Sequence, residues 1–188
     1  LTEVGQLKFM SLRYYREEIN MSKELWQNAA AFAAEKHKYQ TRNDGRPYVS
    51  HCFRVAMTAS IVFGFDDPEI IAGALLHDTI EDCDVDYDEI LEEFGRNVAN
   101  YVAAMTKDMR LEEEIREVAY DKQLADGPWQ GRLIKLADVF DNLTDTLPNK
   151  RKTFMVKADR ILLLTENDEQ LQEARQHLRG LMCEMATC

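Results

Sequence analysis

Apolar and polar residues recur along the chain with the three- and four-residue spacing of amphipathic helices, and no stretch alternates as a half-buried strand would. Gly64, Gly95 and the pair Gly127-Pro128 interrupt this pattern, as residues that end helices do. The pattern predicts helices at about 22–37, 50–63, 67–76 and beyond, 86–95, 96–107, 110–126, 129–146, 149–166 and 168–186. With 188 residues and no long linker, we expect one all-α, multi-helix domain.

Two regions stand outside this helical core. The polar stretch 41–47 contains Asp44-Gly45 and ends in Pro47, so it predicts a loop. Residues 1–20 carry scattered apolar side chains, among them Leu7 and Ile19. We expect 1–20 to form a helical extension that packs on its own domain or on a second copy of the chain, and 21–188 to form the main domain.

The segment after Asp67-Pro68 places ionisable residues where a core residue is expected. Its first turns are apolar all round, which is typical of a buried helix. If the helix continues, His77, Asp78, Glu81 and Asp82 extend that buried face. Buried charges are costly unless a cation or strong partners compensate them, so this stripe predicts a metal site. The alternative is a helix that emerges into solvent after Leu76.

Two other helices offer partners for this stripe. His51 shares an inward face with Val55 and Val62, where it is either a ligand or a satisfied core histidine. In the segment 129–146, Leu136 and Phe140 mark the apolar side, whereas Asp138 lies on the opposite side with Lys135, Asn142 and Asp145. Periodicity alone favours a solvated face for that second set.

Remaining single residues fit structural roles. His37 and His177 sit among charged neighbours, so we expect them to be exposed. Trp26 and Trp129 are expected to anchor the core. The four cysteines show no CxxC spacing, and Cys83 has no His-Asn arrangement that would make it a nucleophile.

Charge and hydropathy exclude several classes of partner. Thirty-four acidic against 23 basic residues leave a net charge of −11, which argues against binding a nucleic acid polymer. A small anionic ligand remains compatible if a metal or local basic cluster neutralises it. No apolar run approaches the roughly 20 residues that span a bilayer. Free thiols and the lack of a basic-then-apolar leader lead us to expect a cytoplasmic protein.

Three motifs together carry a resemblance to a known family. They are Arg42-Asn43-Asp44-Gly45-Arg46-Pro47-Tyr48-Val49-Ser50-His51, then His77-Asp78-Thr79-Ile80-Glu81-Asp82, then Lys135-Leu136-Ala137-Asp138-Val139-Phe140-Asp141-Asn142-Leu143. In this order they resemble the hydrolase domain of the RelA/SpoT family, over about residues 22–165. The chain resembles a free-standing small alarmone hydrolase, a single-domain, all-α bundle of the HD superfamily.

The resemblance implies a reaction and the residues that perform it. It implies removal of pyrophosphate from the 3′ position of ppGpp or pppGpp, which leaves GDP or GTP. Mn²⁺ would be held by His51, His77, Asp78 and Asp138, although two imidazoles and two carboxylates also suit Fe or Zn. Glu81 and Asp82 match the acidic pair that orients and deprotonates the attacking water. Arg42 matches the arginine that packs on guanine, and Asn142 the asparagine that contacts the sugar.

Two departures from the family pattern concern the substrate pocket. Asn43 stands where the family usually has lysine, and Thr144 where it often has arginine. Both changes remove positive charge from the expected pocket. Lys107 is an expected replacement, together with other basic residues nearby in sequence, unless these form an ordinary solvated face. The alternatives are a phosphohydrolase for another nucleotide, such as an adenine alarmone, a nucleoside monophosphate or the ribose phosphate of NADPH, and a non-catalytic nucleotide sensor.

Overall fold

The computed structural model describes residues 24–187, so the predicted extension at 1–20 lies outside the described residues. A first helix covers 24–36. The remaining elements are α2 (Val49–Met57), a π-helical turn (Thr58–Val62), α3 (Pro68–Leu76), α4 (Thr79–Asp82), α5 (Tyr87–Met105), α6 (Glu113–Asp126), α7 (Trp129–Thr144), α8 (Arg151–Leu164) and α9 (Gln172–Thr187). Short 3-10 turns, Pro148–Lys150 and Glu169–Leu171, precede α8 and α9. The predicted all-α class is confirmed for the described part of the chain, where strand-like pairing is limited to one bridge between Thr41 and Pro47.

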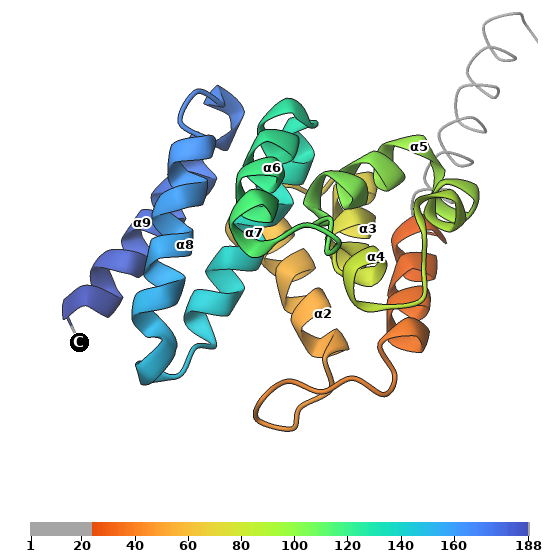
Figure 1. The fold of residues 1–188 in the computed structure, drawn as a ribbon, viewed down its shortest axis with the longest axis horizontal. Helices are drawn as coiled ribbons and strands as arrows, with labels where there is room; N and C mark the ends of the chain where they lie inside the picture. Colours follow the sequence, from red (N-terminus) through yellow and green to blue (C-terminus); the bar gives the residue numbers. More distant parts are fainter. Residues whose placement is uncertain (1–23, 188) are drawn as a thin grey trace, which may run out of the picture.

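Helix α7 is the centre of the fold. It packs against α2, α3, α5, α6, α8 and α9. In Figure 1, α8 and α9 lie on one side of it, and α2, α3, α4 and α5 lie on the other. Leu133, Leu136 and Leu143 of α7 have no solvent exposure. Because neighbours cover several sides of α7, polar residues on its less apolar face are also enclosed.

Glycines end helices where the sequence predicts it. Gly64 has φ +79° and follows the π-helical turn that extends α2. Gly95 has φ +83° and ψ 170°, so α5 is two helical pieces joined at a sharp kink, as expected from helices at 86–95 and 96–107. Gly45 has φ +83° in the predicted loop. A left-handed backbone is costly for residues that carry a Cβ, which explains glycine at these three turns.

The helix that carries the ionisable stripe differs from the prediction. It does not run on past Leu76: α3 ends there, Asp78 has φ −102° and ψ 0°, and α4 begins at Thr79. The Thr79 hydroxyl donates to the Leu76 carbonyl at 2.7 Å, and His77 Nδ1 lies 2.8 Å from the Ala74 carbonyl oxygen. These side chains satisfy carbonyls at the end of α3, which stabilises the break.

Two exposure predictions are wrong. His37 is 1% exposed, because its Nδ1 bonds Gln40 Oε1 at 2.7 Å and its ring lies against Tyr48. Trp26 is 38% exposed, since the buried side of its helix is formed by the small residues Ala29 and Ala33. Trp129 packs against the core, and His177 is exposed, as expected.

Among the helices within residues 24–187, none combines the length and the apolar character that a bilayer crossing requires.

Candidate active site

Three side chains from distant parts of the chain converge at one buried point. His51 comes from α2, His77 from the junction of α3 and α4, and Asp138 from α7. One donor atom from each lies within 4.8 Å of the others. All three residues are buried, so α7 supplies a carboxylate to a centre that two imidazoles complete.

Asp78 joins the same centre. Its Oδ2 lies 2.8 Å from His77 Nε2 and 3.8 Å from His51 Nε2. Asp138 Oδ1 lies 3.2 Å from His51 Nε2 and 3.9 Å from His77 Nε2. The structure therefore brings together the four residues that the sequence motifs select as ligands.

The donor set fits a divalent cation. His77 Nε2 is buried and faces Asp78 Oδ2, while the same ring uses Nδ1 at the Ala74 carbonyl. Since that carbonyl only accepts, Nδ1 carries a proton, which leaves Nε2 as the ring nitrogen that can bind a metal. Two imidazole nitrogens and two carboxylate oxygens are ligands that Mn, Fe and Zn accept.

Electrostatics in this centre also favour a cation. Burial opposes protonation of His51, but hydrogen bonds to Asp138 and Asp141 outweigh it and raise the pKa of His51 to about 9. For His77, burial is likewise outweighed by Asp78, so its pKa also lies above the usual value. The carboxylates thus stabilise positive charge at this point, which a metal ion would supply.

A second layer of side chains holds the four residues in place. Lys135 Nζ donates to Asp138 Oδ2 at 2.7 Å, and the Tyr48 hydroxyl donates to Asp78 Oδ2 at 2.6 Å. Asp141 Oδ2 lies 2.6 Å from His51 Nδ1. The sequence pattern predicts no role for Tyr48 or Asp141. Asp141 stands three residues after Asp138 on the same helix, and this spacing is the one signal in the sequence that could have found it.

The solvated face predicted for α7 is wrong. Asp138 is 6% exposed and Asn142 is only partly exposed. Asn142 Nδ2 donates to Asp138 Oδ1 at 2.5 Å, and Lys135 bonds the other oxygen. Periodicity on one helix cannot report that other helices cover both of its sides, as they do around α7.

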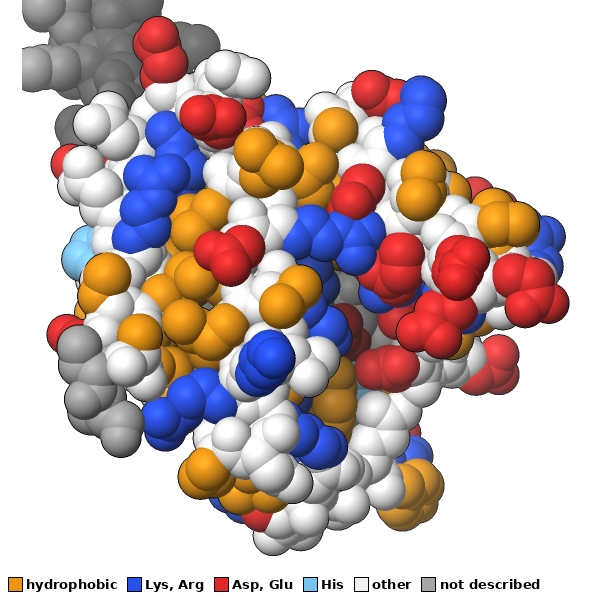
Figure 2. All heavy atoms as spheres, turned by 60° about the vertical axis from the view of Figure 1, so that its left-hand side comes forward, with side chains coloured by type: hydrophobic (Ala, Val, Ile, Leu, Met, Phe, Trp, Pro, Cys, Tyr) orange, Lys and Arg blue, Asp and Glu red, His pale blue; other side chains and the backbone are white. Residues whose placement is uncertain are grey.

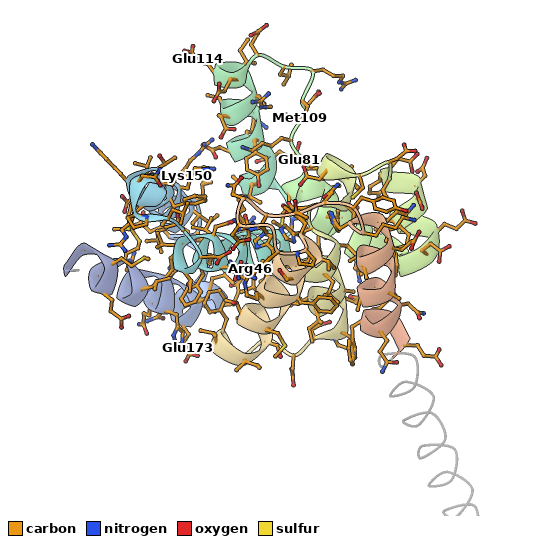
Figure 3. The ribbon with its side chains drawn as sticks, turned by 90° about the horizontal axis from the view of Figure 1, so that it is seen from below. Arg46, Glu81, Met109, Glu114, Lys150 and Glu173 are labelled. Atoms are coloured by element: carbon orange, nitrogen blue, oxygen red, sulfur yellow. The ribbon has the colours of Figure 1, made fainter. Side chains whose placement is uncertain are left out.

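The acidic pair lies at the edge of the centre. Glu81 is partly buried, and its Oε2 accepts the Lys107 backbone N–H at 3.0 Å. Burial raises the pKa of Glu81, and the hydrogen bond to Lys107 opposes that shift. Burial and the Asp78 charge also raise the pKa of Asp82, which is more exposed. Figure 3 shows Glu81 on the side of the molecule toward α6.

A cavity of about 250 Å³ adjoins the centre. Arg42 and Asn142 line it, and the Arg42 guanidinium donates to Asn142 Oδ1 at 3.0 Å. Because Asn142 also donates to Asp138, it links this cavity to the metal centre. The full lining is Arg42, Asn43, Asp44, Asn142, Asp145, Thr146, Leu147, Lys150 and Phe154.

Two residues of the substrate prediction lie elsewhere. Lys107 does not line the Arg42 cavity; it lines a separate one, beside Lys135. The Thr144 hydroxyl donates to the Phe140 carbonyl within α7 at 2.8 Å, so it is turned to its own helix. The structure thus gathers Arg42, Asn43 and Asn142 in one cavity and places Lys107 in another.

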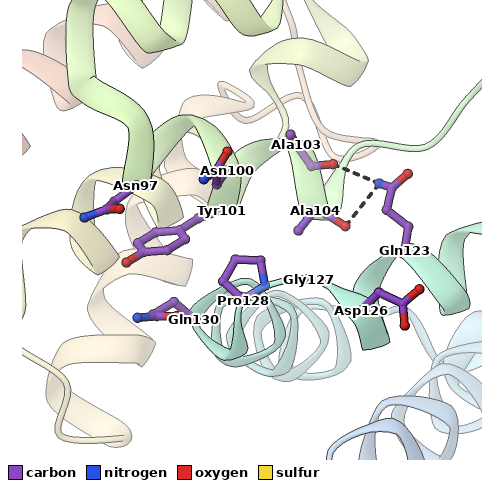
Figure 4. A pocket seen from close by; sticks show the side chains of 10 residues that line it. All are labelled: Asn97, Asn100, Tyr101, Ala103, Ala104, Gln123, Asp126, Gly127, Pro128 and Gln130. Carbon is purple, nitrogen blue, oxygen red and sulfur yellow. Dashed lines mark hydrogen bonds between the residues drawn. The ribbon is translucent and has the colours of Figure 1, made fainter.

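A broader hollow of about 510 Å³ lies away from these residues, between α5 and the turn from α6 to α7 (Figure 4). Gln123 Nε2 donates there to the carbonyls of Ala103 and Ala104, and also to that of Thr106. These carbonyls lie at the C-terminal end of α5, where helix carbonyls need partners from outside the regular helix pattern. Gln123 therefore caps α5, and this hollow contains none of the four convergent residues.

Comparison with known proteins agrees with the fold. A profile of the HD domain matches residues 29–161, more than half of the chain. A solved structure of a metazoan ortholog of SpoT, which hydrolyses ppGpp and plays a role in starvation responses, superposes with a TM-score of 0.76 at 26% identity. That match covers 86% of this chain and 95% of the other. The chain belongs to the HD domain family.

Two sequence relatives are named guanosine-3′,5′-bis(diphosphate) 3′-pyrophosphohydrolase MESH1. The human protein is 35% identical over 167 residues, which cover 81% of this chain and 93% of the human one. The Danio rerio protein is 40% identical over 116 residues, which cover 61% of this chain and 64% of the relative. The resemblance to alarmone hydrolases is therefore borne out by relatives that carry this name.

Proposed function

We propose that this chain is a metal-dependent hydrolase that removes the 3′-pyrophosphate of ppGpp or pppGpp. The observation that carries the proposal is the buried convergence of His51, His77 and Asp138, where His77 Nε2 also lies 2.8 Å from Asp78 Oδ2. Relatives named for this reaction, and the fold shared with a ppGpp-hydrolysing protein, support the choice of substrate.

His51, His77, Asp78 and Asp138 would hold the metal, for which we propose Mn²⁺. When bound, it would supply a Lewis acid that lowers the pKa of water and neutralises charge on the phosphoryl group. The protein's part is to hold these donors in the correct orientation. Lys135 and Asn142 hold one ligand, Asp138, through its two carboxylate oxygens.

Glu81 and Asp82 would orient the attacking water and accept its proton. The water oxygen forms a bond to the phosphorus that is attached to the 3′ oxygen. The bond between this phosphorus and the 3′ oxygen breaks. Its electron pair stays on the 3′ oxygen, which takes up a proton that balances the one accepted by the acidic pair. Burial raises the pKa of Glu81, which makes this carboxylate a stronger base.

The Arg42 cavity would hold the nucleoside. The Arg42 guanidinium offers a flat cationic surface for the base, and Asn142 offers an amide to the sugar. Asn43 lines the same cavity and would contribute hydrogen bonds without charge. Lys107 would contact the phosphates from the neighbouring cavity.

The second candidate function is hydrolysis of a different nucleotide, and the charge of the Arg42 cavity is the observation that favours it. Asp145 lines this cavity and accepts hydrogen bonds from Arg42 and Arg54, so part of the positive charge is already paired. Neither Asn43 nor Thr144 adds a cation. An adenine alarmone, a nucleoside monophosphate or NADPH are the substrates to compare.

Product identification tests the proposal. The purified chain is incubated with ppGpp and Mn²⁺, and the products are separated by chromatography. We expect GDP and pyrophosphate. Release of orthophosphate, or turnover of another nucleotide in the panel but not of ppGpp, would transfer the assignment to the second candidate. Binding of ppGpp without turnover would instead indicate a sensor.

Two substitutions separate metal binding from chemistry. Asp78→Asn should lose both Mn²⁺ and activity, whereas Glu81→Gln should keep Mn²⁺ and lose about 10²- to 10⁴-fold in turnover, the usual effect of removing a general base. Glu114→Gln is the matched control, because Glu114 is an exposed residue at the outer end of α6 (Figure 3). Full activity in Asp78→Asn would refute the proposed centre.

The binding partner and the location of the protein follow from the same reaction. We propose a small nucleotide as its partner rather than a nucleic acid polymer, and a cytoplasmic location. We further propose that two copies of the chain associate through residues 1–20. Light scattering of the full chain measures this association directly.

A further inference from the structure

A small cationic cavity lies between α6, α7 and α8. Lys107, Lys135, Lys157 and Arg160 line it, with Glu117 and Asp121 as the acidic residues. Its volume of about 60 Å³ holds about four water-sized atoms, at roughly 15 Å³ for each. That is the size of one phosphoryl group. Figure 2 shows Lys and Arg side chains along one border of a hollow in the middle of the molecule, with Asp and Glu side chains along another.

Three of the four cations already have anionic partners. Lys107 pairs with Glu117 at 2.5 Å, and Arg160 pairs with Glu117 at 2.5 Å and with Asp121 at 2.6 Å. Lys135 pairs with Asp138 at 2.7 Å.

Lys157 differs from these three. Lys157 is an exposed residue at the rim of the cavity, and no ion pair among the described residues involves it; its Nζ lies 5.1 Å from the centre of the Phe154 ring. Partial desolvation and the charges of Lys135 and Lys107 lower its pKa. This ammonium group lacks the anion that its neighbours have.

The cavity is attached to the proposed catalytic centre at two points. Lys135 bonds the ligand Asp138, and the Lys107 backbone N–H bonds Glu81. Along α7, Lys135 lies one turn before Asp138, and Asn142 lies one turn after it. The metal centre therefore stands between the cationic cavity and the cavity that holds Asn142.

Helix α8 also contributes side chains to both cavities, in the reverse chain order to α7. Phe154 lines the Arg42 cavity, and Lys157, one turn later, lines the cationic one. A nucleotide whose nucleoside occupies the Arg42 cavity would thus extend its 3′ phosphates past the metal centre toward Lys157.

We propose that Lys157 binds the outer phosphate of the 3′-pyrophosphate, the phosphate that does not react, and so positions the pyrophosphate group for attack by water. This deepens the proposed function and rests on it for the identity of the substrate. Binding of pyrophosphate itself is independent of that identity.

Calorimetric titration of the full chain with inorganic pyrophosphate in the presence of Mn²⁺ tests this inference. Lys157→Met removes the charge and keeps the length, and Lys157→Arg restores a cation. We expect Lys157→Met to weaken pyrophosphate binding about tenfold, the effect of one lost charged hydrogen bond, and Lys157→Arg to recover most of it. The KM for ppGpp should rise by a similar factor, with a smaller change in kcat.

Lys122→Met is the matched control. Lys122 is on α6, its side chain is 79% exposed, and it pairs with Asp126 outside the cavity. An equal loss in both methionine variants, or unchanged pyrophosphate binding in Lys157→Met, would overturn the inference. Weaker binding of GDP with unchanged binding of pyrophosphate would also overturn it, since Lys157 would then contact the 5′ phosphates. If the wild type binds pyrophosphate through Lys157 but leaves ppGpp intact, only the proposed substrate fails.

Discussion

His51 Nδ1 lies 2.6 Å from Asp141 Oδ2, and both residues are buried. Asp141 is itself held by Arg54, whose Nε donates to Oδ1 at 2.6 Å. A carboxylate on Nδ1 fixes the ring so that Nε2 faces the proposed metal centre. The orientation of this imidazole thus depends on a residue that is not itself one of the proposed ligands.

We predict that Asp141→Asn weakens Mn²⁺ binding about 10- to 100-fold, the usual effect of losing such a partner, because the amide holds the ring less firmly. Isothermal titration with Mn²⁺ measures this directly. Asp159→Asn, an exposed position on α8, is the control. Equal Mn²⁺ affinities in all three proteins would show that Asp141 does not support the centre.

Metal binding should stabilise the fold. A ligand at 100 times its Kd adds about 2.7 kcal/mol, which for a chain of this length corresponds to a rise in Tm of about 5–10 °C. We predict this rise on adding Mn²⁺ and its reversal by a chelator, because the centre joins α2, α3 and α7. Scanning calorimetry with His77→Ala should show no Mn²⁺ effect, whereas His177→Ala, an exposed histidine, should behave like the wild type.

The partly buried Glu81 carboxylate should make stability depend on pH. Its pKa is raised by burial, against the hydrogen bond from Lys107, with Asp78 adding to the shift and Lys107 and Lys135 reducing it. An acid with a raised folded-state pKa is ionised more easily in the unfolded chain, so its ionisation destabilises the fold as pH rises from the unfolded pKa through the folded one.

We therefore predict that Glu81→Gln, without metal, is more stable than the wild type at pH 8 and equal to it at pH 4. Gln keeps the oxygen that accepts from Lys107 and lacks the charge. Thermal unfolding at both pH values gives the comparison. A difference of the same size at the two pH values would mean that packing, not ionisation, causes it.

Two glycines should respond in opposite directions to alanine. Gly95 has φ +83° and ψ 170° with open space where a Cβ would lie, so the cost of Gly95→Ala is that of this glycine-specific backbone conformation alone, about 1–3 kcal/mol. Gly180 lies within α9, where a Cβ meets nothing within 4 Å, and Gly180→Ala should stabilise by about 0.5–1 kcal/mol. Urea unfolding measures both. A stabilising Gly95→Ala would contradict the kink in α5.

Much of this fold and part of the proposed metal centre can be predicted from the amino-acid sequence. Helical spacing and glycine predict α2 with its π-helical continuation up to Gly64, and the kink of α5 at Gly95, because these features depend on local backbone preferences. The motifs select His51, His77, Asp78 and Asp138, since each motif is contiguous in sequence. The break at Asp78 does not follow from the pattern, because side-chain bonds to α3 carbonyls decide it.

Only the tertiary structure decides which polar residues are enclosed. Periodicity places Asp138 on a solvated face and His37 among exposed charges, yet both are buried. The roles of Asp141 toward His51, and of Lys157 beside Lys107 and Lys135, likewise join residues that are distant in sequence or on separate helices. The physical reason is that burial depends on how the helices pack together. The sequence of a single helix indicates which side is apolar, and its neighbours determine whether the other side meets water or protein.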